Sequence, residues 1–440
     1  MVFYQTPGVY VREVPSGTRP IQAVGTSTAG FVGVMPDRGA RVNELVAVES
    51  WTRFREIFAN VPEPEATPLA LAVRGFFDNG GRRLHVVNVG DPSAPITGPH
   101  QGLALFEAVD EIAIVAAPGH TDLASHDLLI QHATKMEDRF AILDGPATVD
   151  RVERLTQVAV APVPTTTRET GGRGRRREEP AEEEGAEDTS EAGTEETDAA
   201  EDTTAAAPAP PPPPPGPPGE SDGLRPPVSD YAAFYFPQIV VTDPFSRRTV
   251  VAAPSGHLAG IYARTDATRG VHKAPANEPI RGALNLTYRV TPEEQGTLNP
   301  AGVNCLRYFA AGGITVWGAR TLDRGPYTYI NVRRLVNMLK ESIADGTNWC
   351  VFEPNDYLLW KRITRDVRAF LLRVWRDGAL MGRTPEQAFF VKCDEETNPP
   401  EAVDAGEVRC QIGIAPVKPA EFVIFEISHT ERGSESGEGG

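Results

Sequence analysis

Short apolar runs alternate with helix-spaced apolar residues over the first 160 positions of the chain. The strand candidates are 29–35, 83–89, 111–116 and 139–144. Between them, helices are predicted to begin at Ser50 and at Thr67, because Ser and Thr are favoured N-cap residues, and a third helix is predicted from about Asp122 to Glu137. Apolar residues follow Ser50 at helical spacing. Strands that alternate with helices predict an open α/β layer structure.

The pattern changes in the second half of the chain. Strand-like sequence is predicted at 233–242 and 249–264, and a buried strand at 314–319. Two amphipathic helices follow, one over about 330–344 and one from behind Pro354-Asn355 to Gly378. The polar face of the second helix is rich in arginine: Arg362, Arg365, Arg368, Arg373 and Arg376. This face either contacts an acidic partner or is a solvated helix face.

Both ends of the chain have the pattern of strands set off by hinges. Residues 7–14 precede Pro15-Ser16-Gly17, and residues 420–429 follow Pro416-Val417-Lys418-Pro419. The second strand has apolar residues on both faces, so it needs a sheet to join. A terminal strand that leaves its own domain can complete a neighbour's sheet, which favours an assembly protein over an enzyme. The residues expected to pair between subunits are Val9, Tyr10, Val11, Phe422, Val423, Ile424, Phe425 and Ile427, and the hinges are Pro15, Gly17, Pro416 and Pro419.

Residues 165–228 have a composition typical of disorder. The segment contains an arginine cluster at 171–177, thirteen acidic residues and no basic one between 178 and 202, and a proline run at 210–215. Folded sequence lies on both sides, so we expect a surface excursion. Repulsion between particles, docking of a host partner and solvation alone are the roles considered, and solvation is the preferred interpretation.

Composition narrows the class of protein. The 440 residues are enough for two or three domains, and a hydrophobic content of 40% is enough for real cores. No run of about 18 apolar residues predicts a membrane span, and no secretory signal is visible. Much of the net charge of −17 lies in the acidic segment, which leaves the remainder nearly neutral and without a basic face for nucleic acid. The cysteines Cys305, Cys350, Cys393 and Cys410 lie far apart in the sequence, and we expect buried free thiols.

Three polar motifs resemble reactive sites but lack the required spacing. His120, Asp122, His126, Asp127 and His132 form no known metal-ligand pattern, and we expect polar residues on a helix surface. Residues 33–39 lack the Gly-Lys-Ser/Thr ending of a phosphate loop, and residues 254–257 lack the first glycine of a nucleophile elbow. We therefore predict no catalytic, cofactor or metal site.

Segments spread along the chain resemble the contractile tail sheath family, which comprises the sheaths of phage tails, R-type bacteriocins and extracellular contractile injection systems. The matching segments are 6–14, 21–33, 39–54, 273–282, 298–321 and 349–355. Lys273-Ala274-Pro275-Ala276-Asn277-Glu278-Pro279-Ile280-Arg281-Gly282 is the sharpest internal match. The resemblance covers nearly everything except about 165–228, and the order of the segments makes it specific.

The resemblance implies a structural function. Subunits of this family stack as hexameric rings around an inner tube, exchange N- and C-terminal strands, and contract to drive the tube through a target envelope. The implied fold class is α/β, with an α+β core, an inserted α/β domain and mixed sheets. The implied domains are a core of 1–24 plus 285–440 and an outer α/β domain of 25–284, which carries the insert 165–228.

The implied partners are other copies of the chain, an inner tube protein, and baseplate and terminal cap proteins, with no nucleic acid and no membrane insertion. We hypothesise that Arg362, Arg365 and Arg368 face the inner tube. Synthesis and assembly are expected in the cytoplasm, after which the protein is part of a phage tail or a tail-like particle. Two alternatives stay open. One is a baseplate or adaptor ring protein that exchanges the same terminal strands, and the other is an α/β hydrolase, for which no catalytic residues stand out.

Overall fold

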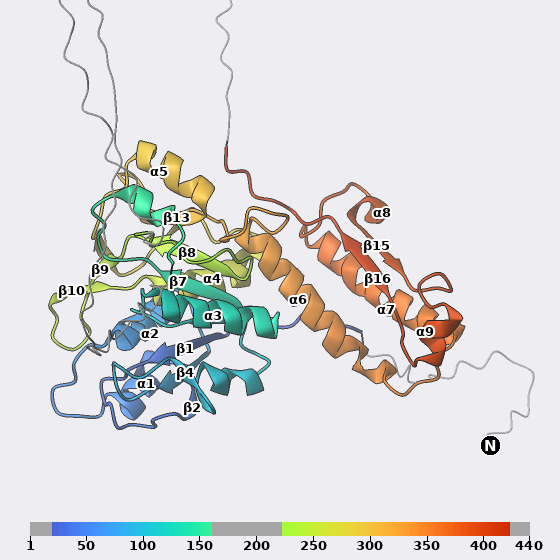
Figure 1. Cartoon of the computed structure of the whole chain (residues 1–440), viewed down its shortest axis with the longest axis horizontal. Coiled ribbons are helices and arrows are strands. Elements are labelled where there is room, and N and C mark those ends of the chain that lie inside the picture. Colours follow the sequence, from blue (N-terminus) through green and yellow to red (C-terminus); the bar gives the residue numbers. More distant parts are fainter. Residues whose placement is uncertain (1–19, 161–221, 423–440) are drawn as a thin grey trace, which may run out of the picture. The chain divides into compact units, whose positions relative to one another are not determined.

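The computed structural model describes residues 20–160 and 222–422, and its largest element is a nine-stranded mixed sheet (Figure 1). From one edge to the other the strands are β11 (Glu278–Pro279), β14 (Gly313–Trp317), β13 (Val303–Phe309), β8 (Ala232–Phe236), β7 (Phe140–Asp144), β6 (Ile114–Ala116), β1 (Ala29–Gly33), β3 (Leu84–Asn88) and β2 (Leu45–Val48). The strands from β13 to β3 run parallel, and antiparallel strands flank them on both sides.

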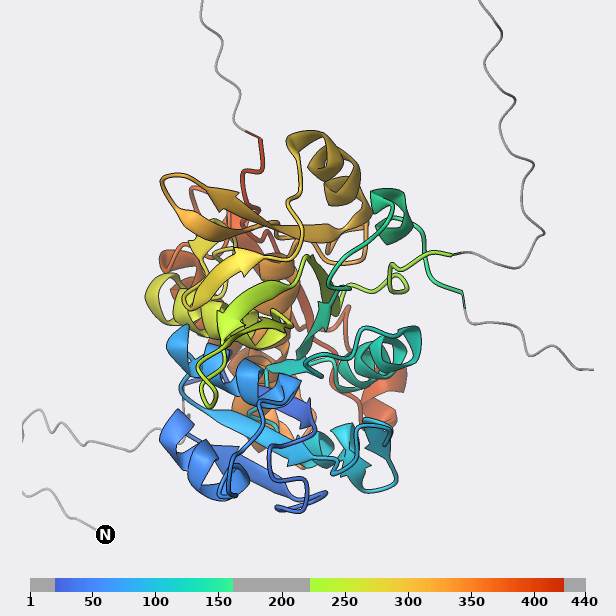
Figure 2. The ribbon, with the colours of Figure 1, turned by 90° about the vertical axis from the view of Figure 1, so that its left-hand side faces the viewer.

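Helices bury both faces of this sheet. On one face α1 (Trp51–Phe58), α2 (Pro68–Asp78) and α4 (Ser255–Arg269) share a core with Phe31, and on the other α3 (Leu123–Met136) shares a core with Val32. Figure 2 shows α3 in teal and α4 in yellow-green on opposite sides of the strands. Neighbouring residues of one strand point to opposite faces, so a strand covered on both sides is apolar throughout. The predicted α/β class is confirmed.

The predicted N-caps of the first two helices, Ser50 and Thr67, are confirmed by their hydrogen bonds. Ser50 Oγ accepts from the backbone N–H of Arg53 at 3.1 Å, and Thr67 Oγ1 accepts from that of Ala70 at 3.2 Å. Asp122 caps α3 in the same way. These bonds satisfy backbone donors that a helix start otherwise leaves unpaired.

Smaller elements complete the part of the chain around the large sheet. An antiparallel sheet is formed by β10 (Thr249–Ala252), β9 (Ile239–Thr242) and β12 (Ala283–Leu286), and a second by β4 (Thr97–Gly98) and β5 (Gln101–Gly102). The remaining elements of this part are α5 (Pro292–Leu298) and the 3-10 turns η1 (Leu103–Ala108), η2 (Val152–Leu155) and η3 (Asn299–Ala301). A further 3-10 turn, η4 (Asn348–Cys350), belongs to the C-terminal part of the chain.

The last hundred described residues contribute a third core. Its elements are α6 (Ile330–Thr347), α7 (Tyr357–Arg376), α8 (Pro385–Ala388), β15 (Phe389–Lys392), α9 (Pro400–Asp404) and β16 (Gln411–Ile414). Apolar side chains of α6, α7 and the β15–β16 sheet pack together, and Ile21 from the start of the described chain joins them. The two predicted amphipathic helices are therefore confirmed, with α7 capped by Asp356.

Two sequence-based expectations are wrong. Residues 255–264, predicted to be strand-like, form most of α4, which is buried nearly all round and so shows little amphipathic periodicity. The predicted disordered insert also ends too late. Arg225 is only 3% exposed, and its guanidinium donates to the carbonyl oxygens of Ala301 (2.6 Å) and Leu322 (2.7 Å). Residues 161–221 lie outside the described chain.

The large sheet crosses the predicted domain boundary at 284/285. Strand β13 pairs with β8 in parallel, and β14 pairs with β13 and with β11. Backbone hydrogen bonding thus joins β13 and β14, expected in the core domain, to the α/β layer. We propose a revised division near residue 323, with 1–24 kept beside the C-terminal part because Ile21 packs in the third core.

Candidate assembly interface

The sheet formed by β15 and β16 is the part of the described chain best suited to accept another strand. The two strands are antiparallel, with Phe389 opposite Ile414 and Lys392 opposite Gln411. In the described residues the sheet contains only these two strands, so backbone donors and acceptors on its outer edges have no ladder partner there. Unpaired sheet edges are templates for pairing with another chain.

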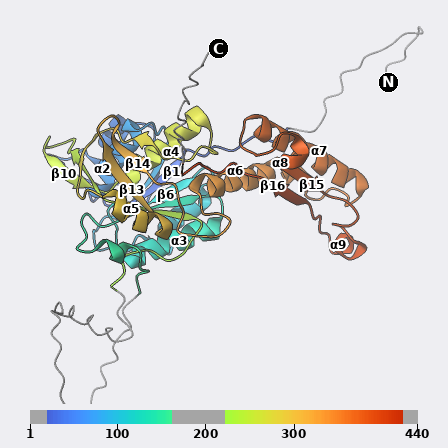
Figure 3. The same cartoon turned by 90° about the horizontal axis from the view of Figure 1, so that it is seen from above.

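The two faces of this small sheet differ. Phe389 is buried against α7 together with Ile363, Val367 and Phe370. Phe390 points the other way and is 56% exposed. Its ring lies over Gly413 on the paired strand, where any Cβ atom would collide with the ring. Figures 1 and 3 show β15 and β16 along one side of α7. One face is therefore anchored, whereas the other offers aromatic surface.

The described C-terminal segment is held at two points. The N–H of Met381 donates to the carbonyl of Ala415 (2.7 Å), and the N–H of Val417 donates to that of Ala379 (3.2 Å). Further along, Arg320 forms an ion pair with Glu421, with Nε 2.9 Å from Oε1. The predicted hinge residue Pro416 thus lies within a hydrogen-bonded stretch, whereas Pro419 lies between the two anchors.

This segment runs along a groove of about 1090 Å³. The groove is lined by the β14 edge at Trp317, by Arg307 and Arg320, and by residues 417–422. Phe422, the last described residue, is 76% exposed. The chain therefore continues toward the predicted C-terminal strand from an exposed aromatic residue.

The first described residues are fixed to the same helices. Val24 donates its N–H to Ser342 Oγ of α6 at 3.0 Å, and the carbonyl of Ile21 accepts from Arg373 of α7. Arg334 donates to the carbonyl of Thr26 at 2.8 Å. The described chain therefore starts on α6 and α7, near the open-edged β15–β16 sheet, whereas its described C-terminal segment ends in the groove beside β14.

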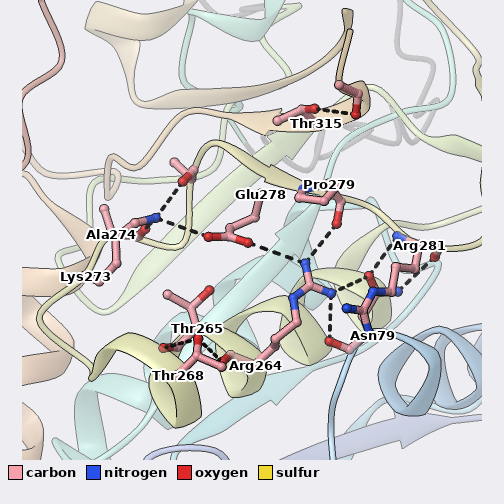
Figure 4. A network of polar contacts seen from close by, with 12 residues as sticks. Asn79, Arg264, Thr265, Thr268, Lys273, Ala274, Glu278, Pro279, Arg281 and Thr315 are labelled. Atoms are coloured by element: carbon pink, nitrogen blue, oxygen red, sulfur yellow. Dashed lines mark hydrogen bonds and ion pairs between the residues drawn. The ribbon is translucent and has the colours of Figure 1, made fainter.

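The segment 273–282 is held at the edge of the large sheet by hydrogen bonds (Figure 4). Lys273 Nζ donates to the carbonyls of Ala274 (2.6 Å) and Ala276 (2.8 Å), and lies 3.5 Å from Glu278. Asn79, the C-cap residue of α2, accepts a hydrogen bond from the Arg281 N–H through Oδ1 (2.9 Å) and donates one from Nδ2 to the Arg281 carbonyl (3.0 Å). These bonds tie β11, and with it the β14 edge, to α2.

Arg264 of α4 adds two further hydrogen bonds that hold this segment. It donates to the carbonyls of Asn79 (3.0 Å) and Pro279 (2.9 Å), and Figure 4 shows it between them. The polar residues of this strongly matching segment are thus occupied by backbone groups. We assign them a scaffolding role at the rim of the groove.

The arginine face of α7 is exposed and partly paired within the chain. Arg365 lies 2.9 Å from Asp366, and Arg368 lies 3.0 Å from Glu386. Arg373 is committed to the Ile21 carbonyl. Both arginine side chains are more than half exposed, and the Arg368–Glu386 pair, which is exposed on both sides, contributes about 0–1 kcal/mol, so the positive face stays available to an acidic partner.

The motifs considered for chemistry are parts of the core. His126 and His132 were expected on a helix surface, but this is wrong: they are 2% and 6% exposed, and burial lowers the pKa of each to about 4. Ser255 Oγ donates to Asp144 Oδ2 at 2.6 Å, and burial raises the pKa of Asp144 to about 6. Across 20–160 and 222–422, no group of three or more His, Cys, Asp or Glu side chains is arranged to hold a metal ion.

Most of the predicted strand-exchange residues lie outside the described chain. These are Val9, Tyr10, Val11, Val423, Ile424, Phe425 and Ile427, together with the hinge residues Pro15 and Gly17. No sequence-based prediction singled out the open-edged β15–β16 sheet or the groove. The only available signal was the alternation of Phe389, Phe390 and Val391, which is short and ambiguous.

Two family models match the second half of the chain. The phage tail sheath protein central domain matches residues 221–322, and the phage tail sheath C-terminal domain matches residues 324–430. The tail sheath protein of Vibrio phage KVP40 is 28% identical over 193 residues, which are 43% of this chain and 28% of that protein. The tail sheath protein of Escherichia phage P2 is 25% identical over 204 residues, 45% of this chain and 50% of that protein. The chain thus matches half or less of the length of these relatives.

Solved structures match over nearly the whole chain. The sheath of the extracellular contractile injection system PVC, in its contracted state, has a TM-score of 0.69 and 25% identity, covering 97% of this chain and 98% of that one. The contracted helical sheath of the anti-feeding prophage has a TM-score of 0.66 and 26% identity, covering 97% and 99%. By its fold and by these similarities, the chain is a sheath-type structural protein. Its second half matches the phage tail sheath family models, and the chain as a whole is similar to the subunits of contractile sheaths.

Proposed function

We propose that this chain is the structural subunit of a contractile sheath. Copies stack as hexameric rings around an inner tube, and contraction drives the tube through a target envelope. The observation that carries the proposal is the similarity, over 97% of the chain, to the contracted PVC sheath. No catalytic role is part of this proposal: Ser255 donates to the buried Asp144 carboxylate, and His126 Nε2 lies 3.2 Å from the Asp144 carbonyl oxygen.

The proposed mechanism of assembly is strand addition. The N-terminal strand 7–14 and the C-terminal strand 420–429 of neighbouring copies would pair with the free edges of the β15–β16 sheet, which supplies unpaired backbone groups and the exposed Phe390. Backbone pairing is directional and survives a rotation of the subunit bodies if the connectors bend. Bending would fall at 15–17 and at 418–420, since 415–417 is hydrogen-bonded to 379–381.

The proposed tube contact is the arginine face of α7. Arg362, Arg365 and Arg368 are exposed and would face acidic groups on the tube. Such a contact would weaken with salt. Further proposed partners are baseplate and terminal cap proteins. The working location is the cytoplasm during assembly, followed by a phage tail or tail-like particle. No helix of the described residues has the length and apolar character needed to cross a membrane.

Electron microscopy of the protein expressed alone tests this proposal. Hollow, ridged tubes of uniform diameter and variable length support a sheath, because only an open-ended assembly gives variable length. If only monomers appear, co-expression with a tube protein asks whether the tube acts as a template. Monomers under both conditions contradict the proposal.

A baseplate ring protein is the second candidate. The observation that favours it is a TM-score of 0.64, with 26% identity, to a chain in the baseplate of the anti-feeding prophage, covering 98% of this chain. A ring protein would form single closed rings at every concentration, with or without a tube protein. The same micrographs therefore separate the two candidates.

A further inference from the structure

Three of the four cysteines lie in one core, although 60 sequence positions separate the first from the last. Cys350, Cys393 and Cys410 all pack with α7 and the β15–β16 sheet. Cys393 follows β15 directly, and Cys410 directly precedes β16. Cys305 belongs to a different core, where burial raises the pKa of its thiol to about 12.

The strand register places Cys393 opposite Cys410. Lys392 pairs with Gln411, so the next position along both strands joins the two cysteines. The N–H of Ala415 donates to the carbonyl of Ala388, which marks 388 and 415 as a hydrogen-bonded pair. Antiparallel pairs alternate in type, and five steps further on the cysteines form a pair without backbone hydrogen bonds.

That type of pair suits a disulfide. Its Cα atoms are about 4.5 Å apart, and disulfides accept Cα separations of about 4.4–6.8 Å. Both thiols are free in this structure. The two residues can therefore be bridged without moving the strands apart.

The two thiols also differ in pKa, and oxidation requires one of them to be a thiolate. A hydrogen bond with the Cys410 thiol lowers the pKa of Cys393, and Asn398 Nδ2 adds a contact 3.7 Å from the Cys393 sulfur. The same interaction raises the pKa of Cys410. Cys393 is thus the better thiolate, and Cys410 is a protonated neighbour. Thiolates, not thiols, attack oxidants.

We propose that Cys393 and Cys410 are a redox pair that closes to a disulfide in the presence of a peroxide. The Cys393 thiolate attacks hydrogen peroxide, forming a sulfenic acid and releasing hydroxide. The Cys410 sulfur then attacks the sulfenic sulfur, forming the S–S bond, and its proton leaves with the hydroxyl group as water. Each disulfide consumes one peroxide. An added dithiol reverses the oxidation by exchange.

The bond would staple the β15–β16 sheet at one end. It closes the loop 393–410, which contains α9, and so restricts the unfolded chain. If this sheet is the strand acceptor of the proposed sheath, the disulfide would stabilise assembled particles against unfolding of the sheet once they reach an oxidising medium. That consequence rests on the proposed function, whereas the disulfide itself does not.

Peptide mapping of the full chain tests the pair. Purified protein is treated with hydrogen peroxide, remaining thiols are alkylated under denaturing conditions, and peptides are identified by mass spectrometry. We expect one linked peptide joining Cys393 to Cys410, lighter by two hydrogen atoms and released by dithiothreitol. Cys305 and Cys350 should be alkylated, and Cys350→Ser should give the same linked peptide.

A thermal shift provides the second readout. Oxidation should raise the midpoint of unfolding by roughly 5 °C in the wild type and in Cys350→Ser, but not in Cys410→Ser. Alkylation of both Cys393 and Cys410 after peroxide treatment would overturn the proposal, as would a disulfide from Cys350 to either. Failure to form tubes in the micrographs would count against the sheath proposal and leave the linked peptide unaffected.

Discussion

The nine-stranded sheet and the β15–β16 sheet differ in how their faces and edges are covered. The large sheet is covered by helices on both faces, and its β14 edge is covered by β11, which Asn79 and Arg264 tie down. The small sheet has one buried face, an exposed Phe390 and no further strand in the described residues. One region is complete within a single chain. The other has edges that could each accept a further strand, and we propose it as the place where copies of the chain assemble.

Removal of residues 1–15 is the largest test of this contrast. The deletion takes away one proposed donor strand but no residue of the nine-stranded sheet, so we expect a folded monomer that forms no tubes. Circular dichroism checks the fold, and electron microscopy checks assembly.

Deletion of 170–220 is the matched control. It removes a longer segment but no donor strand, and it spares Arg225, whose guanidinium bonds hold the end of the insert. Normal tubes are expected. Long tubes from the N-terminal truncation would show that strand addition is not what propagates the assembly.

Asp266→Ala should damage the contact between the two regions. Asp266 of α4 and Arg334 of α6 are both buried, and Arg334 Nη1 lies 3.0 Å from Oδ1. Removing the carboxylate leaves a buried guanidinium without its counter-charge, which costs about 3–5 kcal/mol. Urea unfolding measures the loss. Arg368→Ala, which breaks a pair with the exposed Glu386, should change stability by at most about 1 kcal/mol. Equal effects of the two substitutions would contradict this assignment.

Acid should unfold the α/β region before the α7 region. The pKa of each of His126, His132 and His257 is lowered to about 4 by burial, below the ordinary value of about 6.5. Their stabilising contribution is therefore full above pH 6.5 and is lost as the pH falls toward 4, by up to about 1.4 kcal/mol per pH unit for each. Asp144 acts in the opposite direction, because its raised pKa of about 6 favours the folded state at lower pH. The three histidines together outweigh Asp144, so the stability of the α/β region should fall as the pH falls toward 4.

Hydrogen exchange at pH 7 and pH 5 measures this difference. Residues 324–422 contain no histidine, so amides of α7 should keep their protection while those of β6 and β7 lose it. His132→Gln keeps an acceptor near Arg139 and should reduce the net pH dependence by nearly half, because Asp144 already offsets part of the effect of the three histidines. Simultaneous loss of protection in α7 would show that the two regions unfold as one unit.

How far the sequence predicts this contrast depends on periodicity. Helix α7 was predictable because its apolar stripe is strong and Asp356 caps it. Helix α4 was not, because it is buried nearly all round. The acceptor sheet has four-residue strands, and the Cys393–Cys410 pair depends on a register that no local pattern encodes. The terminal strands were predicted because proline hinges isolate them, and they stay a prediction because most of their residues lie outside the described chain.

The smallest expected effect concerns the arginine face of α7. Reversal of Arg365 and Arg368 to Glu removes two exposed positive charges whose pairs within the chain are weak, so the folded state should be hardly affected. If the face contacts an acidic tube, sheath–tube binding should weaken by roughly tenfold at low salt, and the deficit should shrink as salt rises. Co-sedimentation with the tube protein at two salt concentrations measures both. Arg53→Glu with Arg55→Glu on α1 is a matched reversal in the self-contained region and should leave binding unchanged. Equal loss in both double variants would mean that net charge, rather than the α7 face, governs the contact.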